Sequence, residues 1–369
     1  MRTRHRGSQR RSNQEPELES GAGWRRAQAV LWLVGLGVVL ALMIRPRFGL
    51  SALWRVLIAS APALLVFAPG IWRNICPLAT SANLLRRRHF KRWRLGPAWQ
   101  GRFFFFSLVL LLILVPLRHV VLDTNGILTA GLLMGVTIVA AVLGSLFEGK
   151  SGWCSGLCPV LPVETLYGSR PGVTVSNMHC DRCERCVGVC PDSTPGMDPL
   201  GANLTQWHTV AGMLMAGGFP GFVWGWFQVG DYTGPEGWSH LGRAYGLPIG
   251  AMMVTLAIYL VVRLALTAQH RTRLTRVFAA SAVACYYWYT IPALVGFGAT
   301  GARGALVDLS AVLPAGFPMV SHAISTALFA WWLVFRPETG RSWCRRPIFA
   351  RGSSAQPGLA AITMDGRPT

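Results

Sequence analysis

Four cysteines stand close together between residues 180 and 191, with the spacing C-x2-C-x2-C-x3-C-P. They are Cys180, Cys183, Cys186 and Cys190, and Pro191 follows the last of them. Two-residue gaps let one tight loop supply three thiolates to a [4Fe-4S] cluster, while the fourth thiolate leaves towards another cluster. A structural zinc site more often pairs two C-x2-C units across a longer gap. The run therefore predicts iron-sulfur chemistry, and zinc is the alternative.

Four further cysteines are candidates for the remaining ligands. They are Cys76, Cys154, Cys158 and Cys344, and each follows an apolar stretch of the chain. Eight thiols match two [4Fe-4S] clusters with four ligands each, so we expect all eight to bind metal and none to be catalytic. The ninth, Cys285, lies among apolar residues, where a thiol usually packs as a small side chain. The spacing leaves open which remote cysteine belongs to which cluster.

The composition predicts an all-α membrane protein with about eight spans. Of its 369 residues, 52% are hydrophobic and only 14% are charged, and the mean hydropathy is +0.39. A helix needs about 20 apolar residues to cross a bilayer. Stretches of that length occur at 27–44, 52–72, 103–122, 126–147, 208–229, 247–268, 277–297 and 315–335.

The distribution of positive charge predicts the orientation of these spans. The net charge is +20, and 28 of the 35 lysines and arginines lie in the two termini or in the loops after the even-numbered spans. Such loops face the cytoplasm in membrane proteins. We therefore expect an inner or plasma membrane protein with both termini and all eight candidate thiols on the cytoplasmic side. A reducing cytoplasm argues against disulfides, and the basic block at 86–94 indicates contact with anionic lipid rather than with nucleic acid.

The predicted organisation has five parts. A small cytoplasmic, ferredoxin-like iron-sulfur segment at 148–207 separates two groups of four spans. The other parts are a disordered basic tail at 1–26, spans one to four at 27–147 with a basic cytoplasmic loop at 73–102, spans five to eight at 208–335, and a cytoplasmic tail at 336–369.

Three motifs together resemble the NapH/NosR group of membrane-bound iron-sulfur proteins. They are Cys76-Pro77, the unit Trp153-Cys-Ser-Gly-Leu-Cys158-Pro159, and the run from Cys180 to Pro191. The resemblance implies an electron-transfer component that passes single electrons between a membrane or quinol pool and a redox partner or respiratory complex. One departure is that Trp72 stands where a cysteine paired with Cys76 would be expected. We expect Cys344 to supply the missing thiol.

Other interpretations stay open at this point. His119 or His322 could bind a haem or a quinone near the outer side of the membrane. The same cysteines would also suit an assembly or maturation reductase for a membrane metalloenzyme, or a non-redox membrane protein that holds zinc. The sequence does not name the electron donor or acceptor.

Overall fold

The structure is a computed structural model, which describes residues 15–84, 93–180, 186–201, 205–232, 235–298 and 305–345. Of residues 15–20 and 235, it describes the backbone alone. Cys183, the basic block at 86–92 and the tails at 1–14 and 346–369 lie outside the described residues.

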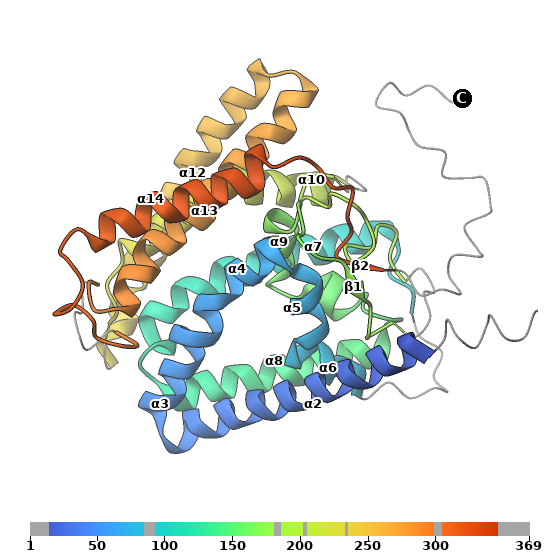
Figure 1. Cartoon of the computed structure of the whole chain (residues 1–369), viewed down its shortest axis with the longest axis horizontal. Coiled ribbons are helices and arrows are strands. Elements are labelled where there is room, and N and C mark those ends of the chain that lie inside the picture. Colours follow the sequence, from blue (N-terminus) through green and yellow to red (C-terminus); the bar gives the residue numbers. More distant parts are fainter. Residues whose placement is uncertain are drawn as a thin grey trace, which may run out of the picture.

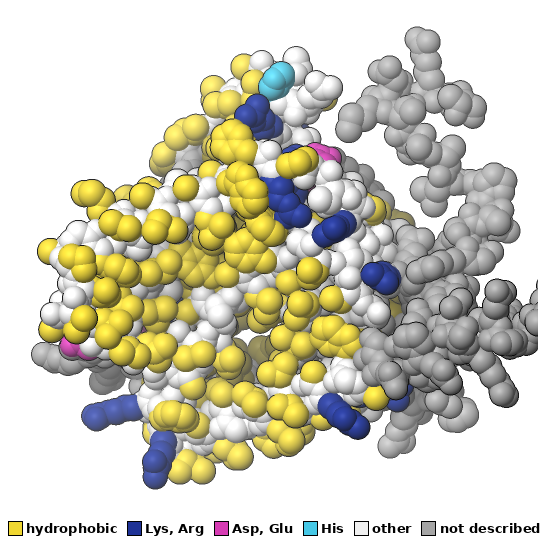
Figure 2. All heavy atoms as spheres, viewed as in Figure 1, with side chains coloured by type: hydrophobic (Ala, Val, Ile, Leu, Met, Phe, Trp, Pro, Cys, Tyr) yellow, Lys and Arg dark blue, Asp and Glu magenta, His cyan; other side chains and the backbone are white. Residues whose placement is uncertain are grey.

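Eight helical segments are long and apolar enough to cross a membrane, as the sequence predicts. They are Gly21–Ile44, Pro46–Phe67, Pro97–Leu122, Gly126–Leu146, Gln206–Phe227, Glu236–Ala265, Ala268–Leu294 and Phe317–Phe335. Val30, Ile138 and Val261 are each more than half exposed on these helices. Figure 2 shows hydrophobic side chains over most of the face in view, with lysines and arginines towards its margins. The protein is therefore an all-α integral membrane protein whose apolar side chains face lipid.

The described secondary structure is helical apart from two very short strands. The α-helices are α2 (Glu15–Ile44), α3 (Pro46–Leu50), α4 (Ala59–Phe67), α5 (Pro69–Ile75), α6 (Pro77–Leu84), α7 (Pro97–Leu117), α8 (Gly126–Leu146), α9 (Leu161–Tyr167), α10 (Gln206–Met213), α11 (Phe219–Phe227), α12 (Leu241–Ala265), α13 (Ala268–Leu294) and α14 (Phe317–Ala330). Turns of other helical types are η1 (Ser51–Ile58), η2 (Arg118–Leu122), η3 (Trp153–Leu157), η4 (Leu214–Gly218), η5 (Pro235–His240) and η7 (Trp331–Phe335). The strands β1 (Val175–Ser176) and β2 (Cys344–Arg345) pair in parallel.

Several predicted boundaries differ from the structure; the sixth and seventh spans, for example, begin at Glu236 and Ala268 rather than at 247 and 277. The first helix begins at Glu15, so the predicted tail at 1–26 is already helical over its last residues. The second span ends at Phe67 rather than at 72, because Ala68 has the non-helical angles φ −148° and ψ 59°. Pro69 follows it, and a proline disfavours helical angles in the residue before it. The break redirects the chain into α5 and so sets where Cys76 lies.

Glycines let the helices of the bundle approach closely. Helix α11 packs on α12, where a Cβ at Gly221 would lie only 2.1 Å from the carbonyl oxygen of Ala251. Helix α8 packs on α6 in the same way, because a Cβ at Gly144 would lie 1.9 Å from the carbonyl oxygen of Ala82. Small residues at such crossings are a common basis of helix association in membranes.

One end of the bundle gathers segments that are far apart in the sequence. Helices α5 and α6, the 148–201 segment with α9 and β1, and the chain that leads to β2 lie together there, as Figure 1 shows. The start of α2 reaches the same end, since Gln28 Nε2 donates to the carbonyl oxygen of Asn74 at 3.0 Å. This end, called the thiol end below, holds the candidate metal ligands.

Candidate metal centre

The first group of thiols comes from the ends of the second and fourth spans. Cys76 lies between α5 and α6, and Cys154 and Cys158 lie in and directly after η3. Burial raises the pKa of both Cys154 and Cys158, and a thiolate at Cys76 raises it further. Ser107 Oγ on α7 donates to the carbonyl oxygen of Cys158 at 2.6 Å and anchors this turn to the bundle.

The second group comprises Cys180, Cys186, Cys190 and Cys344. Burial raises the pKa of Cys180, and the neighbouring thiols of Cys190 and Cys186 raise it further. The pairing of β1 with β2 carries Cys344 to this group, where its backbone N–H donates to the carbonyl oxygen of Asp192 at 2.7 Å. The structure thus places Cys344 beside the cysteine run. The same segment also packs on α5, where a Cβ at Gly70 would lie 2.1 Å from the carbonyl oxygen of Trp343.

The amide of Gln100 on α7 holds the loop between Cys186 and Cys190. Its Nε2 donates to the carbonyl oxygen of Val189 at 3.0 Å, and its Oε1 accepts from the backbone N–H of Gly188 at 3.1 Å. Gln100 itself is buried, so its amide finds its hydrogen-bond partners in the backbone of this loop.

A buried network of four charged side chains lies beside both groups of thiols. Arg73 donates to the carboxylate of Glu164 and is paired with Asp192, and Lys150 Nζ lies 2.7 Å from Asp192 Oδ2. All four side chains are at most 4% exposed. Unpaired charges would be very costly at such depth, so the two carboxylates keep the two cations in place.

The network connects the two groups electrostatically. The guanidinium of Arg73 interacts with the thiols of Cys154 and Cys190, one from each group. The ammonium of Lys150 lowers the pKa of Cys180 and Cys344 in the second group and that of Cys154 in the first. Asp192 is the residue that links these two cations.

Burial governs the protonation of the thiols. It raises the pKa of Cys154 to about 12 and that of Cys344 to about 12, although Arg73 and Lys150 lower both pKa values. Burial would raise the pKa of Asp192 too, but Arg73 and Lys150 hold it well below its usual range. The carboxylate is therefore ionised, while the thiols stay protonated at neutral pH unless a metal takes the place of the proton. An all-sulfur donor set of this kind fits an iron-sulfur cluster.

Two buried tryptophans lie in the segments that carry the thiols. Trp343 is fully buried, donates from Nε1 to the carbonyl oxygen of Gly168 at 2.7 Å, and has the Arg73 guanidinium 5.6 Å from its ring centroid. Trp153 is also buried. Each precedes a cysteine in the sequence, and Trp343 belongs to one buried cluster with Cys344 and Met197.

Sequence reasoning missed the buried charges. Arg73 and Lys150 counted only as loop cations, and Glu164 and Asp192 were not singled out. One sequence feature could have indicated a buried charge, namely that Glu164 stands within the otherwise largely apolar segment Leu161–Tyr167. The whole of this segment is buried in the structure. The charged residues between Cys180 and Cys186 fall outside the described part of the chain.

The remaining candidates lie elsewhere. Cys285 packs against the main apolar core from α13, in line with a packing role. His322 Nε2 lies 2.9 Å from the carbonyl oxygen of Trp288, and the two rings stack at 5.4 Å. Both ring nitrogens of His119 contact protein acceptors, so binding a haem iron there would require breaking one of these contacts.

Comparisons of this chain with protein-family models, with curated proteins and with solved structures find no match.

Proposed function

We propose that this protein is a membrane-bound electron carrier with two [4Fe-4S] clusters. It would pass single electrons between a membrane or quinol pool and a redox partner, through a cytoplasmic, ferredoxin-like segment at 148–207. The observation that carries the proposal is that seven described candidate thiols gather at one end of an eight-helix bundle, in two groups beside one buried charge network. The resemblance to the NapH/NosR group is consistent with this role.

The surroundings of the thiols support one assignment of ligands. In ferredoxin-type runs the first three cysteines share a cluster and the fourth binds the other cluster. By this rule Cys190 would leave its neighbours in the run and become the fourth ligand of the first group. The pairing of β1 with β2 and the hydrogen bond from the Cys344 N–H to Asp192 hold Cys344 beside the run, which supports Cys344 as its fourth ligand. The two proposed sets are Cys76, Cys154, Cys158 and Cys190, and Cys180, Cys183, Cys186 and Cys344.

The separation of the thiols favours clusters over single zinc ions. Zinc holds its thiolates at about 2.3 Å, which brings the sulfurs of one tetrahedral site to within about 4 Å of one another. Among the described residues, only His119, Asp123 and Asp231 form a group of three whose ligand atoms lie within 4.8 Å of one another. No three of the described thiols are that close. The ligands of a four-iron cluster bind separate irons and need not lie so close together.

The buried charges suit electron transfer. Arg73 and Lys150 are buried beside the thiols, so water does not screen their positive charge. Positive charge stabilises the reduced, more negative form of a cluster. Glu164 and Asp192 moderate this effect. Because the four side chains are fixed by ion pairs, the surroundings need little rearrangement when an electron arrives.

The orientation follows from the charges of the loops. The thiol end also carries Arg170, Arg276 and Arg336, which lie in or beside the loops expected to face the cytoplasm. The positive-inside rule therefore supports a cytoplasmic position for both clusters.

The test is metal analysis of the full chain, purified without oxygen. We expect about eight irons and eight sulfides per chain and, after reduction, electron paramagnetic resonance signals of two [4Fe-4S] clusters. Zinc in place of iron, or fewer than about four irons, would overturn the proposal. A quinol analogue that reduces the clusters in the isolated protein would identify the quinol pool as the electron donor.

A further inference from the structure

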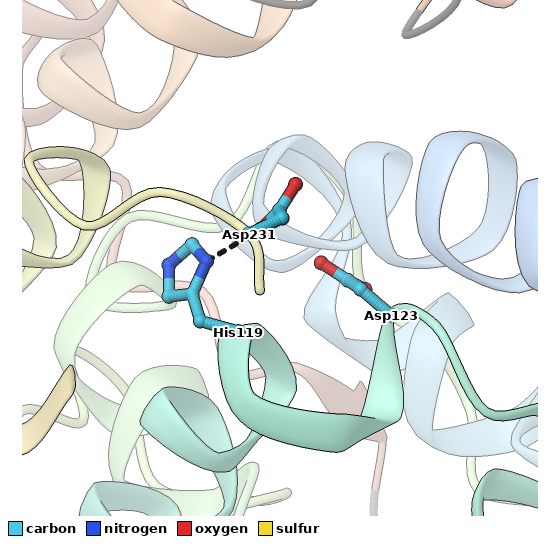
Figure 3. A group of neighbouring side chains, drawn as sticks. All are labelled: His119, Asp123 and Asp231. Carbon is cyan, nitrogen blue, oxygen red and sulfur yellow. Dashed lines mark hydrogen bonds and ion pairs between the residues drawn. The ribbon is translucent and has the colours of Figure 1, made fainter. Parts of the chain in front are cut away.

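A second polar site lies at the end of the bundle opposite the thiols. Helix α7 starts beside the cysteine run and leads into η2, which carries His119 and is followed by Asp123. Asp231 comes from the loop after α11, and Figure 3 shows its side chain next to the His119 ring. The ligand atoms of these three residues lie within 4.8 Å of one another.

Both nitrogens of the His119 ring face an oxygen that can accept a hydrogen bond. Nδ1 lies 2.6 Å from Asp231 Oδ1, and Nε2 lies 3.0 Å from the carbonyl oxygen of Trp226. The carbonyl oxygen has no hydrogen to give, so Nε2 must carry a proton and donate it. A neutral imidazole would then present a bare Nδ1 lone pair to an ionised carboxylate. A contact of 2.6 Å between them therefore needs a second proton.

We propose that His119 and Asp231 form a proton-binding site that exchanges with water at this end of the membrane. The His119 side chain is 5% exposed, whereas that of Asp231 is 46% exposed. The histidine therefore holds the proton inside the bundle, and the carboxylate connects it to the aqueous phase. This inference does not depend on the iron-sulfur proposal.

The neighbouring charges favour a proton over a metal ion. Asp123 forms an ion pair with Arg118, in which Arg118 Nε lies 2.6 Å from Asp123 Oδ1. Burial would raise the pKa of Asp231, but the hydrogen bond from His119 and the charges of Arg118 and Arg55 lower it, so the carboxylate is ionised. Two ligands of one metal ion, each about 2 Å from it, would stand further apart than 2.6 Å.

The proton also fastens a loop to the bundle. The backbone N–H of Tyr232 donates to the carbonyl oxygen of His119 at 3.0 Å, and the ring of Tyr232 stacks on that of His240. Loss of the shared proton would set the Asp231 carboxylate against a lone pair. Deprotonation would therefore loosen the loop after α11. The protonation state of His119 and Asp231 would thus control how firmly this loop is attached to the bundle.

The experiment uses the full chain with ¹⁵N-labelled histidine in lipid bilayers. The His119 resonances are identified as those that disappear in H119Q. At pH 7 we expect the signature of a doubly protonated imidazolium, with no infrared band of a protonated Asp231 carboxyl group. A neutral His119 together with an ionised Asp231 would overturn the proposal.

Two variants separate a proton site from simple packing. D231N removes the charge but keeps the shape, so an imidazolium at position 119 should be lost at pH 7. D123N is the matched control, and it should keep the protonated pair because Asp123 is occupied by Arg118. Retention of the imidazolium in D231N would contradict the role of Asp231.

Discussion

The backbone N–H of Cys344 donates to the carbonyl oxygen of Asp192 at 2.7 Å, and this bond joins the last described segment of the chain to the end of the cysteine run. The side chain of the same Asp192 pairs with both Arg73 and Lys150. One residue therefore connects the C-terminal thiol, the run and the charge network. Changes to residues of this connection should affect both of the proposed clusters, so these residues are the most informative to change.

Replacement of Cys344 by alanine should remove one cluster. We expect iron to fall from about eight to about four per chain, with one set of electron paramagnetic resonance signals lost. Cys285→Ala is the matched control, because Cys285 packs in α13 against the apolar core and should leave the iron content unchanged. A C344A protein that keeps eight irons would contradict the proposed ligand set.

Replacement of Asp192 by asparagine should destabilise the protein strongly. It leaves the buried cations Arg73 and Lys150 without their shared carboxylate, and breaking a buried ion pair typically costs about 3–5 kcal/mol. Thermal unfolding in detergent measures the effect. Glu338→Gln is the control, because Glu338 pairs with Arg276 at a 66% exposed position and should change stability by less than about 1 kcal/mol. Equal effects of the two variants would show that the network contributes little.

Two glycines with the same backbone conformation provide a test of the second cluster. Gly149 has φ +60° and Gly340 has φ +59°, so alanine costs about 1 kcal/mol of backbone strain at either position. A Cβ at Gly149 would also lie 3.0 Å from Cys186 Sγ, whereas none of the described atoms comes within 4 Å of a Cβ at Gly340. We expect G149A to lower the iron content and G340A to preserve it. Equal iron content in both variants would place Cys186 outside the cluster.

Replacement of Trp343 by phenylalanine should expose the clusters to oxygen. The indole is fully buried and donates to Gly168, and phenylalanine can neither fill its volume nor make this bond. The visible absorbance of the clusters should bleach several-fold faster in air than in the unmodified protein. Trp238→Phe, at a half-exposed position in η5, should bleach at the original rate. Unchanged bleaching in W343F would argue against a shielding role for this indole.

The sequence by itself determined the features that depend on neighbours in the chain. Hydropathy over about 20 residues is a local property, so the eight spans could be predicted to within a few residues at most ends. The spacing of Cys180 to Cys190 is equally local, and it gave the iron-sulfur hypothesis. The asymmetry of positive charge gave a predicted orientation for the same reason.

Only the tertiary structure decided which distant groups meet. The sequence placed Cys344 at the proposed metal site, but the pairing of β1 with β2 decided that it joins the cysteine run. The pairing of Arg73 and Lys150 with Asp192 also required the fold, because a charge in a loop shows neither its depth nor its partner. Likewise, the proton between His119 and Asp231 follows from two contacts made across the bundle. Such contacts depend on helix packing, which local patterns do not encode.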